Sequence, residues 1–406
     1  MEKNKIKVFI ILLIISIIIV ITTIFGIKYY EKWRIANAKI IVVLEDNLEL
    51  EVFNDAKLSD FLKSINGTLI DDFKINTTTI GQKTINFKYI NEEDIEVSYG
   101  FNINVVDKTP PIIFSSTSFS VTEGYTGNLA KELFCGDNYD DFPKCELTGT
   151  YDYNTPGNYQ VTFTGTDSSN NISINNFTLT VKPKKTTSQT PSTTTPAKTQ
   201  NFADLYAKYK TENTKIGLDV SHWQGDIDFQ KVKDAGVGFV FIRVGTQKGI
   251  GGEYYLDKKF EQNINGFQNV GIPVGIYFYS YANSINSAKK EARWIVEQLK
   301  PYKIDLPVAF DWENWSFYQE FNKSFYNLTE MANTYLQVLE KAGYKGMLYS
   351  SKNYLEKVWF KTKYPVWLAH YTEQTSYQGE YKVWQLCSNG RIPGIYGNVD
   401  VNVMYN

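Results

Sequence analysis

The chain has 406 residues and a formal net charge of −2, from 42 basic and 44 acidic side chains. This length predicts two to four domains. The near balance of charge argues against a nucleic-acid partner, because nucleic-acid binders usually carry a clustered basic excess. The two histidines and three cysteines lack the short spacings of a zinc site, so we expect no metal and no other cofactor.

A charge-free apolar segment near the amino end predicts a membrane helix. Residues 8–27 carry no charge, and a helix of that length spans the ~30 Å hydrocarbon core of a bilayer. The alternative is a cleaved signal peptide, but the small residues Ala36-Asn37-Ala38 lie beyond a charged stretch, too far from the apolar core. We therefore predict a cytoplasmic tail and anchor over 1–37, attached to the cell membrane through 8–27, with the remaining chain outside the cell.

Two copies of one β pattern follow, at 38–108 and 109–182. In each copy a glycine opens a strand of alternating apolar residues, and a second alternating strand ends the copy, which predicts small all-β sandwiches. The first copy has Gly81, Ile85, Phe87, Phe101, Ile103 and Val105, and the second has Gly157, Val161, Phe163, Phe177, Leu179 and Val181.

The second copy carries further motifs, in Asp107–Pro111 and Thr155–Tyr159. With them, the two copies resemble the bacterial immunoglobulin-like domains that occur in tandem on surface proteins. Such modules either bind a ligand or act as spacers, and the spacer is favoured here. Cys135 and Cys145 lie in one loop of the second copy, where an extracellular location permits a disulfide.

A linker over 183–204 separates these modules from a larger domain over 205–406. Residues 183–200 are rich in Thr, Ser, Pro and Lys and lack large apolar side chains, so we expect an extended tether. Beyond it, helical patterns separate the early strands, the clearest over 288–299, and this alternation predicts a parallel α/β sheet that closes into a barrel. No long helix is apparent between the last three strands, so we expect an irregular barrel. The eight strand-like runs are Ile216–Val220, Gly238–Val244, Val274–Tyr281, Pro307–Glu313, Gly346–Ser350, Pro365–Ala369, Lys382–Leu386 and Val399–Met404.

Four acids fall at the ends or edges of these strands. Asp311 and Glu313 are two residues apart, and side chains alternate along a strand, so both point the same way. Two acids on one inward face repel each other, whereas glycoside hydrolysis needs such a pair. Asp219 and Asp400 lie on the first and last strands, which are neighbours in a closed barrel. Any one of the four alone is better explained as a solvated or capping carboxylate.

Eight motif-like runs in this domain resemble glycoside hydrolase family 25, the Chalaropsis-type lysozymes. They occur in order and cover nearly all of 214–406. The runs are Gly217–Gly225, Ile227–Phe229, Phe241–Thr246, Val274–Ser280, Leu306–Val308 with Asp311–Glu313, Trp367–Tyr371, Val383–Gln385 and Gly397–Asn402.

The resemblance implies an irregular TIM-like barrel of eight strands and five helices that cleaves the β-1,4 bond between N-acetylmuramic acid and N-acetylglucosamine in peptidoglycan. Glu313 then matches the general acid. Asp311 matches the carboxylate that holds the substrate's 2-acetamido group as it attacks. Asp219 and Asp400 match the acids that complete the pocket. Trp312 departs from the family, which often has an aliphatic residue there, and we expect it between the sheet and the helices.

Four aromatic side chains near the strand ends are candidate platforms for sugar rings, with core packing as the alternative for each. They are Tyr277, Tyr279, Tyr371 and Trp384. His222 is expected to be a structural hydrogen-bonding residue, and Cys387 a buried inert thiol.

The sequence therefore favours a membrane-anchored lysozyme that acts on peptidoglycan glycan strands during cell-wall remodelling. Two other hypotheses stay open: a wall-glycan-binding surface protein without catalysis, and a hydrolase of another amino-sugar polymer such as chitin. The presence of both Asp311 and Glu313 argues against a glycan-binding protein without catalysis.

Overall fold

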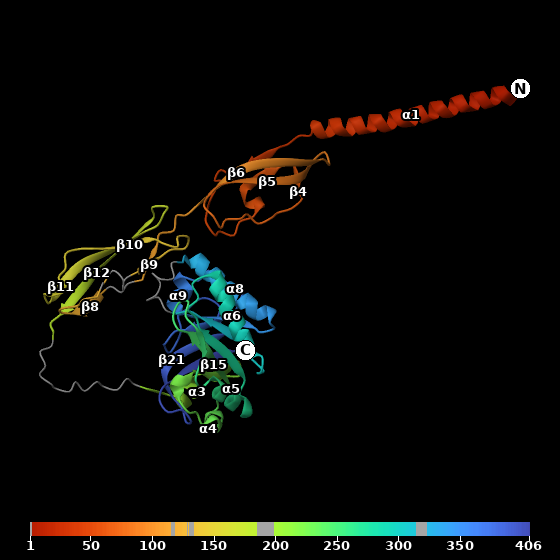
Figure 1. Cartoon of the computed structure of the whole chain (residues 1–406). Helices are drawn as coiled ribbons and strands as arrows, with labels where there is room; N and C mark the ends of the chain where they lie inside the picture. The colour runs from red at the N-terminus through yellow and green to blue at the C-terminus, as the bar shows by residue number, and fades with distance from the viewer. Residues whose placement is uncertain (1, 115–117, 128, 130–133, 185–198, 314–322) are drawn as a thin grey trace. The chain divides into compact units, whose positions relative to one another are not determined.

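The computed structural model describes all residues except 1, 115–117, 128, 130–133, 185–198 and 314–322 (Figure 1). Most of the predicted linker and the residues directly after Glu313 thus lie outside the described residues. The chain forms two compact units, Met1–Lys108 and Thr109–Asn406.

The first unit begins with the helix α1, Glu2–Ala36. Its span Asn4–Ala36 is apolar enough and long enough to cross a membrane, and it is the only such helix among the described residues. Its large apolar side chains are exposed along its length, so no protein core in this unit accounts for them.

The rest of the first unit is a small β module. Two short strands, β1 (Val42–Leu44) and β3 (Leu62–Ile65), pair antiparallel. A four-stranded sheet has the order β2-β6-β5-β4, with β2 (Glu49–Glu51) parallel to β6 (Glu96–Val106). The long hairpin of β5 (Gly81–Asn91) and β6 buries every second side chain, as the alternating pattern predicts. A short 3-10 helix, Leu58–Phe61, and β4 (Gly67–Leu69) complete the module.

The second module repeats this plan at the start of the second unit. Its sheet has the order β8-β12-β11-β10, and the outer strand β8 (Ser118–Thr122) is again parallel to the last strand, β12 (Ile172–Lys182). The hairpin partner β11 is Gly157–Thr166, and β10 is Lys144–Thr148. Two short strands, β7 (Ile112–Phe114) and β9 (Phe134–Gly136), pair antiparallel. A disulfide joins Cys135 in β9 to Cys145 in β10.

The larger part of the second unit is a sheet that closes on itself. Its strands run in the order β14-β15-β17-β18-β19-β20-β21, and β22 pairs with both β21 and β14, which completes a ring of eight strands. These are the eight runs predicted from the sequence. The strands are β14 (Thr214–Val220), β15 (Phe239–Gln247), β17 (Val274–Tyr279), β18 (Val308–Asp311), β19 (Gly346–Ser351), β20 (Val366–Ala369), β21 (Val383–Arg391) and β22 (Val399–Tyr405).

Helices follow the early strands, and none lies between β20 and β22, where every residue is described. The helix predicted over 288–299 is α6, and it buries the face that carries Ala288, Ala292, Ile295 and Leu299. The helices are α3 (Phe202–Tyr209), α4 (Phe229–Asp234), α5 (Phe260–Asn269), α6 (Ile285–Leu299), α8 (Phe325–Lys341) and α9 (Lys352–Lys357), with a 3-10 turn at His222–Gln224.

Two details differ from the sequence prediction. The linker was expected to reach residue 204, but β13 (Gln200–Asn201) pairs with β21 and the buried Phe202 begins α3, so ordered structure starts earlier. The last strand, β22, runs antiparallel to both of its neighbours. A connection as short as the one from β21 to β22 cannot carry the chain back to the start of a parallel strand.

Side chains on the two faces of the ring form separate cores. An inner cluster holds Phe239, Phe241, Ala309, Met347, Tyr349, Trp367 and Val383. The alternate residues of the same strands, such as Val308 and Phe310, join the larger cluster between sheet and helices. This alternation of side chains between the two faces decides which polar residues can face the interior of the ring.

Candidate active site

The acid pair lies at the carboxyl end of β18. Phe310 and Trp312 belong to the outer core, so the intervening Asp311 faces the inner side, where its backbone pairs with Tyr279 and Tyr349. Asp311 is 3% exposed, while Glu313 reaches solvent. Trp312 is buried and packs edge-on against Trp359, which confirms its predicted place between sheet and helices.

Asp219 and Asp400 are direct cross-strand partners in the antiparallel pairing of β14 with β22. Asp219 lies near the end of its strand and Asp400 near the start of its own, so the reversed direction of β22 places both at the same rim. Asp219 is buried, and Oδ2 accepts hydrogen bonds from the side-chain amides of Gln385 (2.9 Å) and Asn402 (2.8 Å).

The two amides are themselves held by inner aromatic side chains. The Gln385 Oε1 atom accepts from the hydroxyls of Tyr349 (2.8 Å) and Tyr371 (3.0 Å), and the Trp367 indole donates to Asn402 Oδ1 at 2.8 Å. Each amide oxygen is thus occupied, so each amide nitrogen must point at Asp219.

Sequence reasoning assigned no role to Tyr349, Gln385 or Asn402. The sequence feature that could have identified them is the alternation of side chains along a strand, since each is a polar residue at an inward position of a predicted strand. Gln385 and Asn402 even pair across β21 and β22. Reading that signal requires knowing which face is inward.

Burial raises the pKa values of all four acids, and the charge of a neighbouring carboxylate adds to the rise for Asp311, Glu313 and Asp400. Burial raises the pKa of Asp311 well above its usual range, and the neighbouring charge of Glu313 adds to this rise. Burial raises the pKa of Glu313 too. Burial and the charge of Asp219 raise the pKa of Asp400 to about 9, while burial raises that of Asp219 against the opposing effect of its amide donors. The four groups therefore titrate as one interacting set, with pKa values above those of ordinary carboxyls.

The four candidate platforms lie in different places. Tyr277 and Tyr279 are half-buried on the inner side, and Tyr277 contacts Trp367 edge-on. Tyr371 is 57% exposed, with its hydroxyl bound to Gln385. The prediction that Trp384 is a platform for a sugar ring is wrong.

Trp384 is 3% exposed and belongs to the outer core, where it packs edge-on against Tyr209 of α3. Its indole donates to the backbone oxygen of His370 at 2.9 Å. One step along the strand, Gln385 faces the acids instead. Trp384 therefore supports the fold between β21 and α3.

His222 has the structural role expected of it. Its Nδ1 atom lies 3.0 Å from the Asp257 carboxylate, which also accepts from Arg243 Nε at 2.9 Å. Burial opposes ionisation of Asp257, but donors from Lys259, Arg243 and His222 outweigh it and lower its pKa. This arrangement fixes the turn that carries Trp223, whose ring is 76% exposed beside His222.

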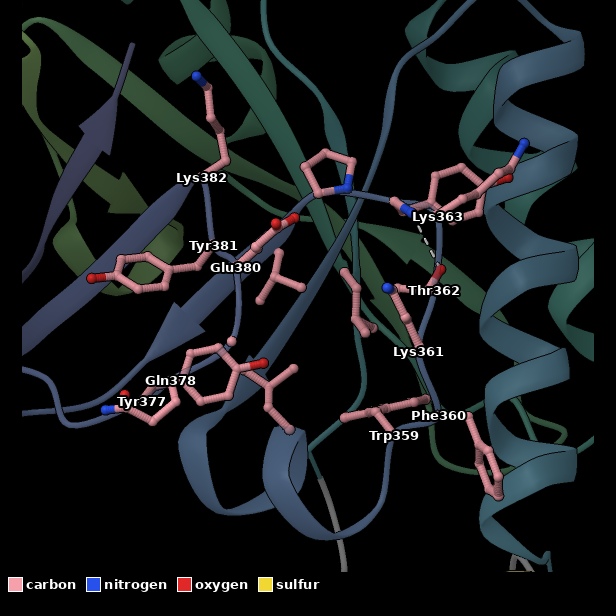
Figure 2. A pocket seen from close by; sticks show the side chains of 16 residues that line it. Trp359, Phe360, Lys361, Thr362, Lys363, Tyr377, Gln378, Glu380, Tyr381 and Lys382 are labelled. Atoms are coloured by element: carbon pink, nitrogen blue, oxygen red, sulfur yellow. Dashed lines mark hydrogen bonds between the residues drawn. The ribbon is translucent and has the colours of Figure 1, made fainter. Parts of the chain in front are cut away.

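A cavity of about 750 Å³ lies elsewhere in the domain (Figure 2). It is lined by residues 359–366, which lead into β20, and by residues 377–382, which precede β21. Because these strands are parallel to β18, the cavity is at the amino ends of the strands and the acid pair is at the carboxyl ends. Lysines dominate its charged lining, and none of the four acids reaches it.

A pair of interacting carboxyls with raised pKa values, at the rim of a closed sheet, can supply the two carboxyl groups that hydrolysis of a glycosidic bond needs. Comparison with known proteins narrows this class. Residues 218–395 match the family model "Glycosyl hydrolases family 25", a range that includes Asp219, Asp311 and Glu313. The chain thus carries a glycoside hydrolase domain of family 25, of the lysozyme type.

Individual relatives cover the same part of the chain. The uncharacterized protein YegX of Escherichia coli (strain K12) is 29% identical over 195 residues, which are 46% of this chain and 68% of that protein. Lysozyme M1 of Streptomyces globisporus is 29% identical over 210 residues, 46% of this chain and 66% of that protein. A family 25 glycosyl hydrolase from Bacillus anthracis superposes with a TM-score of 0.41 at 24% identity, covering 49% of this chain and 90% of its own.

Proposed function

We propose that this chain is a membrane-anchored lysozyme. It hydrolyses the β-1,4 bond between N-acetylmuramic acid and N-acetylglucosamine in peptidoglycan, from outside the cell, in cell-wall remodelling. The observation that carries the proposal is the state of Asp311. Its Oδ1 atom is buried and receives no hydrogen bond from the described part of the chain. A buried acceptor without a donor lowers the stability of the fold. We therefore infer that the substrate supplies the hydrogen-bond donor for Oδ1.

The chemistry follows from how the pair shares its proton. Before substrate binds, the deeper burial of Asp311 favours the proton there. The N–H of a 2-acetamido group, donated to Oδ1, stabilises the ionised form of Asp311 and leaves the proton on Glu313. Glu313 then protonates the leaving glycosidic oxygen. The ionised Asp311 orients the acetamido group and stabilises the positive charge that develops on the sugar.

Asp219 and Asp400 complete the pocket in this proposal. The charge of Asp219 raises the pKa values of Asp311, Glu313 and Asp400, so Asp219 helps to keep the pair protonated. Tyr277, Tyr279 and the exposed Tyr371 are the sugar-contacting side chains that we retain, because each lies on the acid-bearing side of the sheet or at its rim.

We also propose the two fold assignments that the sequence predicts, for the catalytic domain and for the two β modules. The ring of eight strands with helices on its outside supports an irregular TIM-like barrel. The paired sheets of the two modules, with their conserved plan, support immunoglobulin-like sandwiches.

Membrane anchoring rests on α1 and has a direct test. We expect the mature protein to keep residues 1–37 and to fractionate with membranes, because twenty charge-free residues match the bilayer thickness. Intact-mass measurement of protein purified from membranes decides this. A mature chain that begins near Lys39 would instead identify the segment as a cleaved signal peptide.

The activity itself is tested by digestion of purified peptidoglycan followed by analysis of the new reducing ends. We expect N-acetylmuramic acid at the reducing ends, because the acetamido-assisted cut lies on its side of the bond. New ends of N-acetylglucosamine alone would contradict the assigned bond. Binding to walls without any new ends would favour the silent glycan-binding alternative, and cleavage of chitin alone would favour the other amino-sugar polymer.

A further inference from the structure

The second β module contacts the catalytic domain at the first turn of α8, within the compact unit Thr109–Asn406. The first N–H groups of a helix have no partner inside it. Here the Phe325 N–H donates to the backbone oxygen of Asp137 at 2.8 Å, and the Tyr326 N–H to that of Asn138 at 3.2 Å. Both acceptors belong to the loop between β9 and β10. The loop thus completes the hydrogen bonding of a helix in another domain.

Asp141 of the same loop adds a charged contact to this turn. Its Oδ1 atom accepts from the Ser324 N–H at 2.7 Å and from the side-chain amide of Asn327 at 2.8 Å. Lys323 Nζ lies 3.6 Å from Oδ2. A carboxylate is favoured at a helix amino end, where the helix dipole is positive. Apolar packing accompanies the polar contact, since the Phe114 ring meets Phe325 edge-on at 6.1 Å between centroids.

The loop is held firmly inside its own module. The Cys135–Cys145 disulfide closes it at the base. Within it, the Asp137 carboxylate accepts from the N–H groups of Tyr139 (2.8 Å) and Asp140 (2.7 Å), and Asp140 in turn accepts from the Ser168 hydroxyl at 2.8 Å. A loop fixed in this way presents its acceptors with little loss of conformational entropy on docking.

The helix that the loop caps is tied to the catalytic strand. Tyr335 of α8 packs edge-on against Phe310, at 4.8 Å between centroids, and Phe310 directly precedes Asp311. Thr329 of α8 accepts from the Phe360 N–H at 3.1 Å, next to Trp359, which packs on Trp312. A displaced α8 would therefore move the neighbours on both sides of Asp311.

We propose that the second β module is a positioning element for the acid pair, and that Asp141 is its key positioning residue. The inference rests on the proposed lysozyme function and extends it: the module acts as part of the catalytic apparatus as well as a spacer. Catalysis is sensitive to misplacements of an ångström or less. Loosening the cap on α8 should therefore lower turnover while leaving the sugar contacts, and hence KM, nearly unchanged.

The test uses the full-length protein in detergent and compares Asp141→Ala with Asp152→Ala. Asp152 is a matched control, because its hydrogen bonds to Asn154 (2.9 Å) and Thr155 (2.6 Å) stay within one exposed turn of the same module. We expect Asp141→Ala to lose about tenfold in kcat on peptidoglycan, in line with loss of a charge-assisted contact. The rate of amide hydrogen exchange in the peptide over Ser324–Thr329 should rise by about tenfold as well. Asp152→Ala should change neither.

Asp141→Asn adds a rescue, because the amide keeps an oxygen for the Ser324 N–H and should recover most of the turnover. A wild-type protein that cuts no peptidoglycan overturns the proposed function, and this inference with it. If the wild type cuts and Asp141→Ala matches Asp152→Ala in kcat, the positioning role alone is overturned. Faster hydrogen exchange at α8 without a fall in kcat also overturns the positioning role, since the contact with the module would then have no effect on the acid pair.

Discussion

Glu313→Gln is expected to reduce peptidoglycan cleavage by about 10²–10⁴-fold, the usual value of general acid help, while the domain stays folded. The amide keeps the shape of the side chain but has no proton to give to the leaving oxygen. Glu313 lies two residues beyond the end of β18, and glutamine has nearly the volume of glutamate, so the exchange keeps the local packing. Initial rates of reducing-end release measure the loss.

Glu356→Gln is the matched control for this substitution. Glu356 is in the same domain, on α9, where it is partly exposed and pairs with Lys352 at 2.7 Å. Its exchange should leave the rate unchanged. Near-wild-type hydrolysis by a folded Glu313→Gln protein would remove Glu313 from the mechanism and leave the acid role to another group of the set.

The rate should also depend on pH in a defined direction. Burial raises the pKa values of Asp311 and Glu313, so the pair keeps its shared proton to a higher pH than two ordinary carboxyls would. As the pH rises through the apparent pKa of the pair, that proton is lost and the rate falls. In wild-type protein this fall should appear above the pH range in which ordinary carboxyls lose their protons.

Glu291→Gln is expected to stabilise the catalytic domain at pH 8, by up to about 4 kcal/mol relative to wild type, and to have little effect at pH 5. Glu291 is a fully buried side chain on α6. It hydrogen-bonds the Ser280 hydroxyl at 2.5 Å and the Tyr281 N–H at 3.3 Å, directly after β17. Burial raises its pKa from 4.5 to about 8. Each pKa unit corresponds to about 1.4 kcal/mol.

The direction follows from proton binding in the two states. Between pH 4.5 and 8 the folded protein keeps the Glu291 proton and the unfolded chain has lost it. Stability therefore falls as pH rises through this window. Glutamine resembles the protonated form at every pH, so the variant avoids the loss from this site. The buried active-site acids contribute the same trend in both proteins and cancel in the comparison.

Denaturant unfolding at pH 5 and pH 8, followed by tryptophan fluorescence, measures this effect. Seven of the eight tryptophans lie in 205–406, so the signal reports mainly on the catalytic domain. Glu297→Gln is the control on the same helix, since Glu297 is exposed and pairs with Lys300. An equal gain for both variants, or a gain that does not change with pH, would contradict the assignment to the buried carboxyl.

Much of this protein could be predicted from local patterns. The eight strand-like runs all became strands of one closed sheet, because apolar runs bounded by polar residues keep their local preference in the fold. The 76-residue offset between Gly81 and Gly157 predicted that the two modules share a plan, and their sheets have the same order and pairing directions. Asp311 and Glu313 were predicted as the catalytic pair because two acids on one inward face repel each other, whereas glycoside hydrolysis needs such a pair.

Tertiary structure alone decided which side of each strand faces the site. Strands buried on both faces are apolar throughout, so their sequence does not mark the inner face, and a one-residue change of parity exchanges the roles of Trp384 and Gln385. The reversed direction of β22, which brings Asp400 to Asp219, comes from a short connection and from pairing with both neighbours. The contact of Asp141 with α8 joins residues 183 positions apart along the chain. No local pattern encodes such a contact, because its energy exists only once both surfaces have folded.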